Sequence, residues 1–136
     1  MANGLYDAAR ESFLNADIDW SVDDIRAILV DTGTYTVNLT THNFLDDIPA
    51  GARIAVSAAL GSKTSAAGVA DAADVTFSAV SGATVEAVVL YKHTGVESTS
   101  NLIAYMDTGM TGLPVTPNGG DITVQWASTT NRIFKL

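Results

Sequence analysis

The sequence predicts an all-β protein: an antiparallel β-sandwich with a short helix near its N-terminus. Three observations favour this class. Apolar and polar residues alternate in many short segments, turn-forming residues separate those segments, and the strands do not alternate with helices. We expect a jelly-roll-like arrangement, which the sequence does not separate from other sandwiches. With 136 residues and 47% hydrophobic content, residues 1–136 are expected to form a single β-sandwich domain that needs neither metal nor disulfide.

The strand predictions rest on alternation with a period of two. In Asp121–Trp126 and in residues 74–79, apolar side chains share one face and polar side chains the other, as in a half-solvated antiparallel strand. Segments Asp24–Asp31 and Val85–Lys92 are apolar on both faces near their middles, which predicts central strands covered on both sides. Further strands are expected at Arg53–Leu60, Leu102–Asp107 and Arg132–Leu136.

Residues 1–20 are expected to form the N-terminal helix and a following turn. Asn3 is placed to cap a helix that runs to Leu14. Apolar residues recur along it at helical spacing: Leu5, Ala8, Ala9 and Phe13. About ten residues do not make a stable helix alone, so this one must dock on the rest of the protein. A second helical turn is predicted over Thr41–Leu45, before Pro49.

The net charge and the absence of cysteine exclude several classes of protein. Fifteen acidic residues against seven basic ones give a net charge of −8, and the bases are scattered, so nucleic acid is not expected as a partner. The chain has no cysteine, which excludes disulfides and thiolate sites and favours a reducing cytosol. It has no apolar run long enough to span a membrane and no signal-peptide pattern, so we expect no membrane contact.

Catalytic signals are absent from the sequence. Catalysis needs a nucleophile with a base, a tuned acid–base pair or a metal. The two histidines, His42 and His93, lie in separate turn-like stretches, and the GxSxG, Ser-x-x-Lys and P-loop patterns do not occur. We therefore predict that the chain is not an enzyme and has no catalytic residues, cofactor or metal. The alternative is a small hydrolase that uses the acidic residues around Asp19.

Four carboxylates gather between residues 17 and 24: Asp17, Asp19, Asp23 and Asp24. Their spacing is similar to that of a calcium loop, but Val22 and Ile28 occupy the positions of the loop's glycine and glutamate. We therefore predict a solvated turn in which Asp19 or Ser21 bonds nearby backbone N–H groups, with calcium binding as the alternative.

Seven apolar or aromatic residues near the two ends of the chain are candidate interface residues: Leu5, Tyr6, Phe13, Trp20, Ile133, Phe134 and Leu136. Large apolar and aromatic side chains are the anchors that protein interfaces use. The alternative for the helix is that it only closes one end of the sandwich. Because termini fray unless they are held, the apolar C-terminal segment is expected to pair in a sheet.

Six stretches carry a resemblance to known proteins: Met1–Asp7, Asp17–Trp20, Asp24–Asp31, Phe44–Arg53, Leu113–Trp126 and Asn131–Leu136. Together they resemble the small virion structural proteins of tailed bacteriophages, of the capsid cement or decoration type. None of these stretches is a chemical motif, so the resemblance indicates kinship and not mechanism.

The resemblance implies a protein made in the bacterial cytoplasm and placed in the virion, on the outer surface of the head. Its expected partners are the major capsid protein and further copies of itself, as a dimer or trimer. A net charge of −8 suits the outside of the shell, because packaged DNA would repel it. The alternative is a tail-associated or fibre-type virion protein that contacts tail components or a host-surface glycan.

Overall fold

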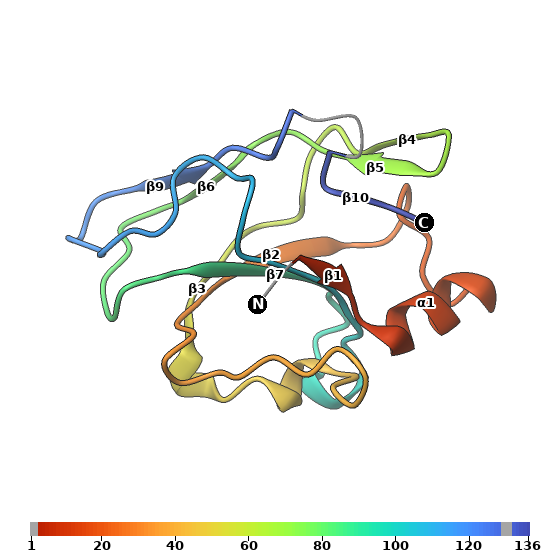
Figure 1. Ribbon diagram of the computed structural model, residues 1–136, viewed down its shortest axis with the longest axis horizontal. Helices are drawn as coiled ribbons and strands as arrows, with labels where there is room; N and C mark the ends of the chain where they lie inside the picture. The colour runs from red at the N-terminus through yellow and green to blue at the C-terminus, as the bar shows by residue number, and fades with distance from the viewer. Residues whose placement is uncertain (1–2, 129–131) are drawn as a thin grey trace.

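Residues 3–128 and 132–136 are described in a computed structural model, in which ten strands form three antiparallel sheets (Figure 1). The large sheet has the strand order β1-β8-β7-β2-β3, and the smaller sheets have the orders β10-β5-β4 and β6-β9. The strands of the large sheet are β1 (Gly4–Leu5), β8 (Leu102–Met106), β7 (Ala87–Lys92), β2 (Ile25–Val30) and β3 (Arg53–Val56). Those of the smaller sheets are β10 (Phe134–Lys135), β5 (Val69–Asp71), β4 (Thr64–Ala66), β6 (Val75–Phe77) and β9 (Ile122–Val124).

The smaller sheets lie over one side of the large sheet, and the segment that joins β2 to β3 lies on the other (Figure 1). That segment contains two 3-10 helices, η1 (Leu45–Asp47) and η2 (Ala50–Ala52), while a third, η3 (Glu97–Thr99), precedes β8. The buried hydrophobic residues form one cluster. The predicted all-β, antiparallel, sandwich-like class is confirmed. A jelly roll divides eight strands between two sheets, whereas here one sheet of five faces sheets of three and two.

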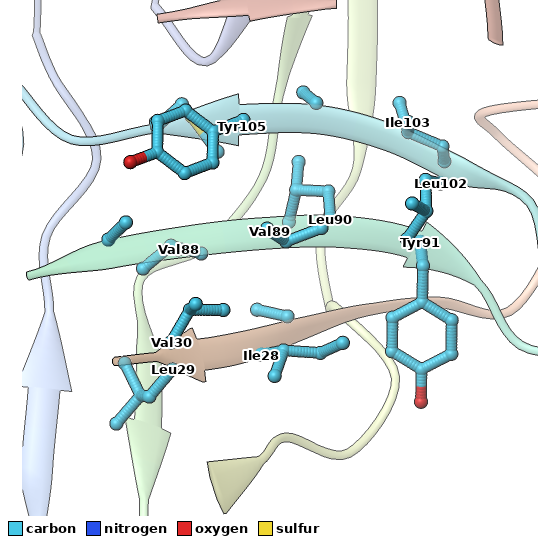
Figure 2. Close-up of a cluster of buried hydrophobic side chains, with 14 of the residues drawn as sticks. Ile28, Leu29, Val30, Val88, Val89, Leu90, Tyr91, Leu102, Ile103 and Tyr105 are labelled. Carbon is cyan, nitrogen blue, oxygen red and sulfur yellow. The ribbon is translucent and has the colours of Figure 1, made fainter. Parts of the chain in front are cut away.

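The centre of the large sheet is formed by the two strands that are apolar on both faces. β2 and β7 pair along their full length, from Ile25 opposite Lys92 to Val30 opposite Ala87. Figure 2 shows their side chains with those of β8, and Leu90 at the centre is fully buried. Full burial of a leucine contributes about 1.5–3 kcal/mol to stability. The predicted central strands are thus confirmed.

The two-stranded sheet keeps the predicted alternation. Val75 and Phe77 of β6 lie opposite Val124 and Ile122 of β9 on the buried face. On the solvent face, the hydroxyl groups of Thr76 and Thr123 are 2.9 Å apart. Each of these strands therefore has one face in the core and one in water.

The N-terminal helix begins later than predicted, and Asn3 does not cap it. The helix α1 spans Asp7–Leu14, and the residue before it makes no capping bond with its side chain. Residues 4–5 pair with β8 instead, because this strand offers their backbone groups a hydrogen-bonded partner. The Asn3 side chain accepts hydrogen bonds from the backbone N–H groups of Asp107 (2.8 Å) and Thr108 (3.1 Å), which fastens the chain end to the turn after β8.

The second helical turn also lies further along the chain than predicted. The prediction was Thr41–Leu45, whereas η1 spans Leu45–Asp47. The Asp47 carboxylate accepts hydrogen bonds from the backbone N–H groups of Asn43 (2.7 Å) and Phe44 (3.2 Å). These two bonds explain why the helical turn starts after Phe44, since a carboxylate at its third position satisfies N–H groups that precede it.

The C-terminal segment is paired in a sheet, as predicted. In β10, Phe134 lies opposite Ala70 and Lys135 opposite Val69 of β5. The backbone N–H of Leu136 also donates to the Gly68 carbonyl oxygen at 2.9 Å. This contact places the end of the chain beside α1 (Figure 1).

Candidate interface at the α1–β10 end

Side chains from both ends of the chain meet where α1 approaches β10. The ring of Phe134 lies 5.2 Å from that of Trp20 in an edge-to-face arrangement and 6.0 Å from that of Phe13. The Trp20 indole N–H donates to the Thr64 carbonyl oxygen at 3.0 Å, which fixes its ring. Aromatic pairs in such geometries add about 0.5–1.5 kcal/mol beyond burial, so these contacts help to hold β10 against α1 and Trp20.

An apolar groove opens beside this aromatic cluster. The side chain of Leu14 is 87% exposed and that of Leu136 is 60% exposed, next to the partly buried Phe13 and Phe134. The groove has a volume of about 360 Å³, and we call it the α1–β10 groove. It is lined by Leu5, Arg10, Phe13, Leu14, Lys135 and Leu136. Apolar surface gathered in one place marks sites of association more often than scattered apolar residues do.

A second hollow, of about 370 Å³, continues the groove between β1 and β10. It shares Leu5, Arg10 and Lys135 with the first and adds Arg132. Arg10 forms an ion pair with Asp7 at 3.2 Å, and Arg132 is 3.5 Å from the Asp71 carboxylate. Two of the three bases that line these hollows are therefore paired with carboxylates of the chain.

The structure brings most of the predicted interface residues to this end but buries several of them. Leu5, Tyr6, Trp20 and Ile133 are less than 9% exposed, so they hold the end together from inside. Phe13 and Phe134 are partly exposed, and only Leu136 projects well into solvent. Leu14, Arg10 and Lys135 line the same groove and were not among the candidates. Once the helix is known to start at Asp7 and to bury Ala9 and Ser12, its phase identifies Leu14 as exposed.

Tyr6 belongs to a buried polar chain below α1. Its hydroxyl group is 2.9 Å from that of Tyr35, which is in turn 2.8 Å from Nδ1 of His42. Burial raises the pKa of Tyr6 well above its usual value. The other histidine, His93, follows β7 and packs edge-on against the ring of Tyr91. The two histidines thus belong to different networks.

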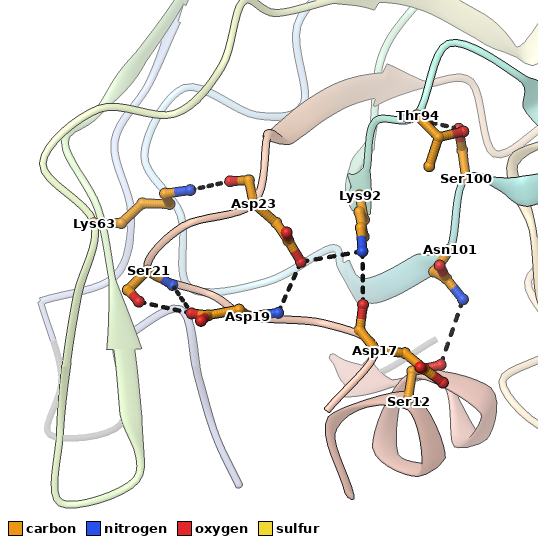
Figure 3. Close-up of polar contacts among 10 residues, drawn as sticks. All are labelled: Ser12, Asp17, Asp19, Ser21, Asp23, Lys63, Lys92, Thr94, Ser100 and Asn101. Atoms are coloured by element: carbon orange, nitrogen blue, oxygen red, sulfur yellow. Dashed lines mark hydrogen bonds and ion pairs between the residues drawn. The ribbon is translucent and has the colours of Figure 1, made fainter. Parts of the chain in front are cut away.

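The acidic segment forms the predicted solvated turn (Figure 3). Asp19 Oδ1 accepts hydrogen bonds from the hydroxyl (2.6 Å) and the backbone N–H (3.0 Å) of Ser21, and these bonds lower the pKa of Asp19. Asp23 Oδ2 accepts from the backbone N–H of Asp19 at 2.8 Å and lies 3.2 Å from the Lys92 ammonium group. The predicted bonding of Asp19 to nearby backbone is confirmed. Within residues 3–128 and 132–136, no three His, Cys, Asp or Glu side chains are grouped to hold a metal.

We expect removal of divalent metal to leave the stability unchanged. The oxygens of Asp19 and Asp23 already accept hydrogen bonds within the turn, so a cation would have to displace existing bonds. The measurement is the melting temperature before and after dialysis against EDTA, and again after calcium is added. A fall of several degrees that calcium reverses would show that metal binds the native state in preference to the unfolded chain.

A third hollow, of about 560 Å³, lies on another part of the surface. Its lining includes the acidic residues Glu86 and Asp107 and the tyrosines Tyr35 and Tyr105. Both tyrosine side chains are only 3% exposed. The hollow therefore offers oxygens but no aromatic face on which a sugar ring could stack.

Comparison with protein-family models and with curated proteins identifies no relative of the chain. No protein-family model matches the chain, and no curated protein matches it. None of the helices in the described part of the chain is long and apolar enough to cross a membrane.

Proposed function

We propose that this chain is a structural component of a tailed-phage particle: a capsid cement or decoration protein that binds the outside of the major capsid protein shell. The observation that carries the proposal is the α1–β10 groove, where Leu14 and Leu136 remain exposed beside an aromatic cluster. Such a surface suits a protein that works by packing against other proteins. The resemblance of six sequence stretches to small virion proteins supports the same role.

Energetic considerations support an accessory role on an assembled shell. Full burial of an exposed leucine contributes about 1.5–3 kcal/mol, so one contact of this kind is modest. A shell with closed symmetry repeats the contact many times, and the total stabilisation grows with the number of copies. The net charge of −8 would keep the chain soluble before it reaches the shell.

The proposal can be tested by adding the purified chain to shells assembled from the major capsid protein alone. We expect the chain to sediment with the shells and to saturate at a fixed ratio of copies to capsid subunits, because closed symmetry repeats one site over the shell. Bovine serum albumin, another acidic protein, serves as the control for non-specific trapping. Failure of the chain to sediment with shells at any concentration would refute the cement role.

A further inference from the structure

Two asparagines of the chain are followed directly by glycine, in the steps Asn3–Gly4 and Asn118–Gly119. In such a step the backbone nitrogen of the glycine can approach the asparagine side chain, because glycine has no Cβ. The nitrogen attacks Cγ and closes a five-membered succinimide, while the carboxamide nitrogen leaves as ammonia with the proton of the attacking N–H. Water then opens the ring to aspartate or to isoaspartate. Both steps are therefore candidates for deamidation, but they lie in different surroundings.

Asn3 is held by a segment that lies far along the chain. Its Oδ1 accepts hydrogen bonds from the backbone N–H groups of Asp107 (2.8 Å) and Thr108 (3.1 Å), and its Nδ2 donates to the Thr108 carbonyl oxygen at 2.9 Å. Gly4 lies opposite Tyr105 in the large sheet. Attack of the Gly4 nitrogen on Asn3 therefore requires β1 to separate from β8 and the side chain to give up these bonds.

Asn118 lies in an exposed turn just before β9, a strand that is remote from α1 (Figure 1). Its Oδ1 accepts a hydrogen bond from the backbone N–H of Gly120 at 3.0 Å, within the same turn. Two backbone bonds hold this turn against residue 80. The Gly119 N–H donates to the Val80 carbonyl oxygen at 2.8 Å, and the Val80 N–H donates to the Gly120 carbonyl oxygen at 2.9 Å. We call these two bonds the Val80 clamp.

We propose that Asn118–Gly119 is a site of spontaneous deamidation, and that opening of the Val80 clamp controls the reaction. While the clamp is closed, the Gly119 N–H is directed at the Val80 carbonyl oxygen, so its nitrogen does not attack Cγ of Asn118. Once the clamp opens, the Gly120 N–H bonded to Oδ1 stabilises the negative charge that develops on this oxygen during attack. A short exposed turn opens at a lower free energy than a pair of strands in the large sheet, so Asn118 reacts before Asn3.

The two products differ in their effect on the turn. Aspartate adds one negative charge, and its carboxylate can still accept the hydrogen bond from the Gly120 N–H. Isoaspartate lengthens the main chain by one carbon immediately before Gly119, so the Val80 clamp no longer fits the turn. Val80 is only 3% exposed, and the isoaspartate form is therefore expected to be less stable. The modification marks chains in which this turn has opened, and the inference does not depend on a role in a phage particle.

The test compares the two Asn–Gly steps within one chain. The full chain is incubated in mildly alkaline buffer, folded or in urea, and peptide mapping by mass spectrometry follows the conversion of each asparagine. In urea we expect the two rates to agree within about twofold, because the folded surroundings are lost. In the folded protein, Asn118 should react at least about tenfold faster than Asn3, and at least about tenfold more slowly than in urea. Asn118→Asp, which has no carboxamide at this position, confirms the assignment of the signal.

A variant that loosens the clamp tests the control step. Asp121 Oδ1 accepts a hydrogen bond from the backbone N–H of Ala79 at 3.0 Å, next to the clamp. We expect Asp121→Ala to raise the folded-state rate at Asn118 at least about threefold and to leave the rate at Asn3 unchanged, because only the turn is loosened. The matched control is Asp31→Ala. It removes a similar bond, from Asp31 Oδ1 to the Gly33 N–H at 2.8 Å, in another turn, and should change neither rate.

Two outcomes would overturn the proposal. If Asn118 reacted as fast in the folded protein as in urea, the Val80 clamp would not restrain the reaction. If Asn3 and Asn118 reacted at the same rate in the folded protein, or rose together in Asp121→Ala, unfolding of the whole chain would control the modification instead. Circular dichroism of each variant, recorded before incubation, shows whether it is folded.

Discussion

Deletion of residues 133–136 is expected to prevent folding or to lower the free energy of unfolding by several kcal/mol. The deletion removes Ile133, which is 6% exposed, and Phe134, which packs against Trp20 and Phe13. It also removes the pairing of β10 with β5 and so exposes the edge of a small sheet. Chemical denaturation with urea, followed by circular dichroism, measures the loss.

Two point variants separate the buried part of this segment from its exposed end. Leu136→Ala should shift the urea midpoint little, because 60% of this side chain is already exposed. Ile133→Ala should account for a substantial part of the loss, since large-to-small changes in a core cost about 2–5 kcal/mol. An unchanged urea midpoint in the deletion variant would show that the C-terminal strand contributes nothing to the fold.

Alkaline solution is expected to unfold the protein as its tyrosines ionise. The chain has four tyrosines, all at most 3% exposed: Tyr6, Tyr35, Tyr91 and Tyr105. Burial raises the pKa of each, and together with Asp107 it raises the pKa of Tyr105 to about 12. The pKa values of these tyrosines in the folded protein therefore lie above the value of about 10 that tyrosine has in the unfolded chain. Their contribution to stability is therefore complete below about pH 10 and is lost as the pH rises towards 12.

The measurement is a titration of tyrosinate absorbance, followed in parallel with circular dichroism. We expect no ionisation in the folded protein near pH 10, and then a steep rise in absorbance that coincides with loss of the circular dichroism signal. The free tyrosine analogue N-acetyltyrosinamide, titrated alongside, gives the reference curve. A gradual titration near pH 10 with the fold intact would contradict the buried environment of these side chains.

The sequence predicts most strands here because their side chains are large and follow a regular pattern. Residues 25–30 and 87–92 are continuous apolar runs, and both are central strands. The hairpin of β4 and β5 was not predicted, because Ser65, Ala66 and Ala70 are small and form no alternating apolar stripe. Its turn depends on backbone conformation, with positive φ at Ala67 (52°) and Gly68 (79°), as a two-residue hairpin requires.

The later start of the helix and the burial of several candidate interface residues have a common cause, which is long-range pairing. Asn3 followed by helical spacing predicts a cap, but β8 offers residues 4–5 a sheet edge, and the helix begins only after that pairing ends. The meeting of Phe13, Trp20 and Phe134 likewise follows from the pairing of β10 with β5. Sequence patterns identify such side chains as apolar, and the strand order decides which of them stay exposed.

The central claim, that the chain decorates a phage head, is tested most directly by its copy number in purified virions. Quantitative gel analysis against the major capsid protein gives this number, and separation of heads from tails locates the protein. A decoration protein should be present in copies on the order of hundreds and should remain with the heads, because closed symmetry repeats its site over the shell. A handful of copies that are released with the tails would contradict the claim and favour the tail-associated role.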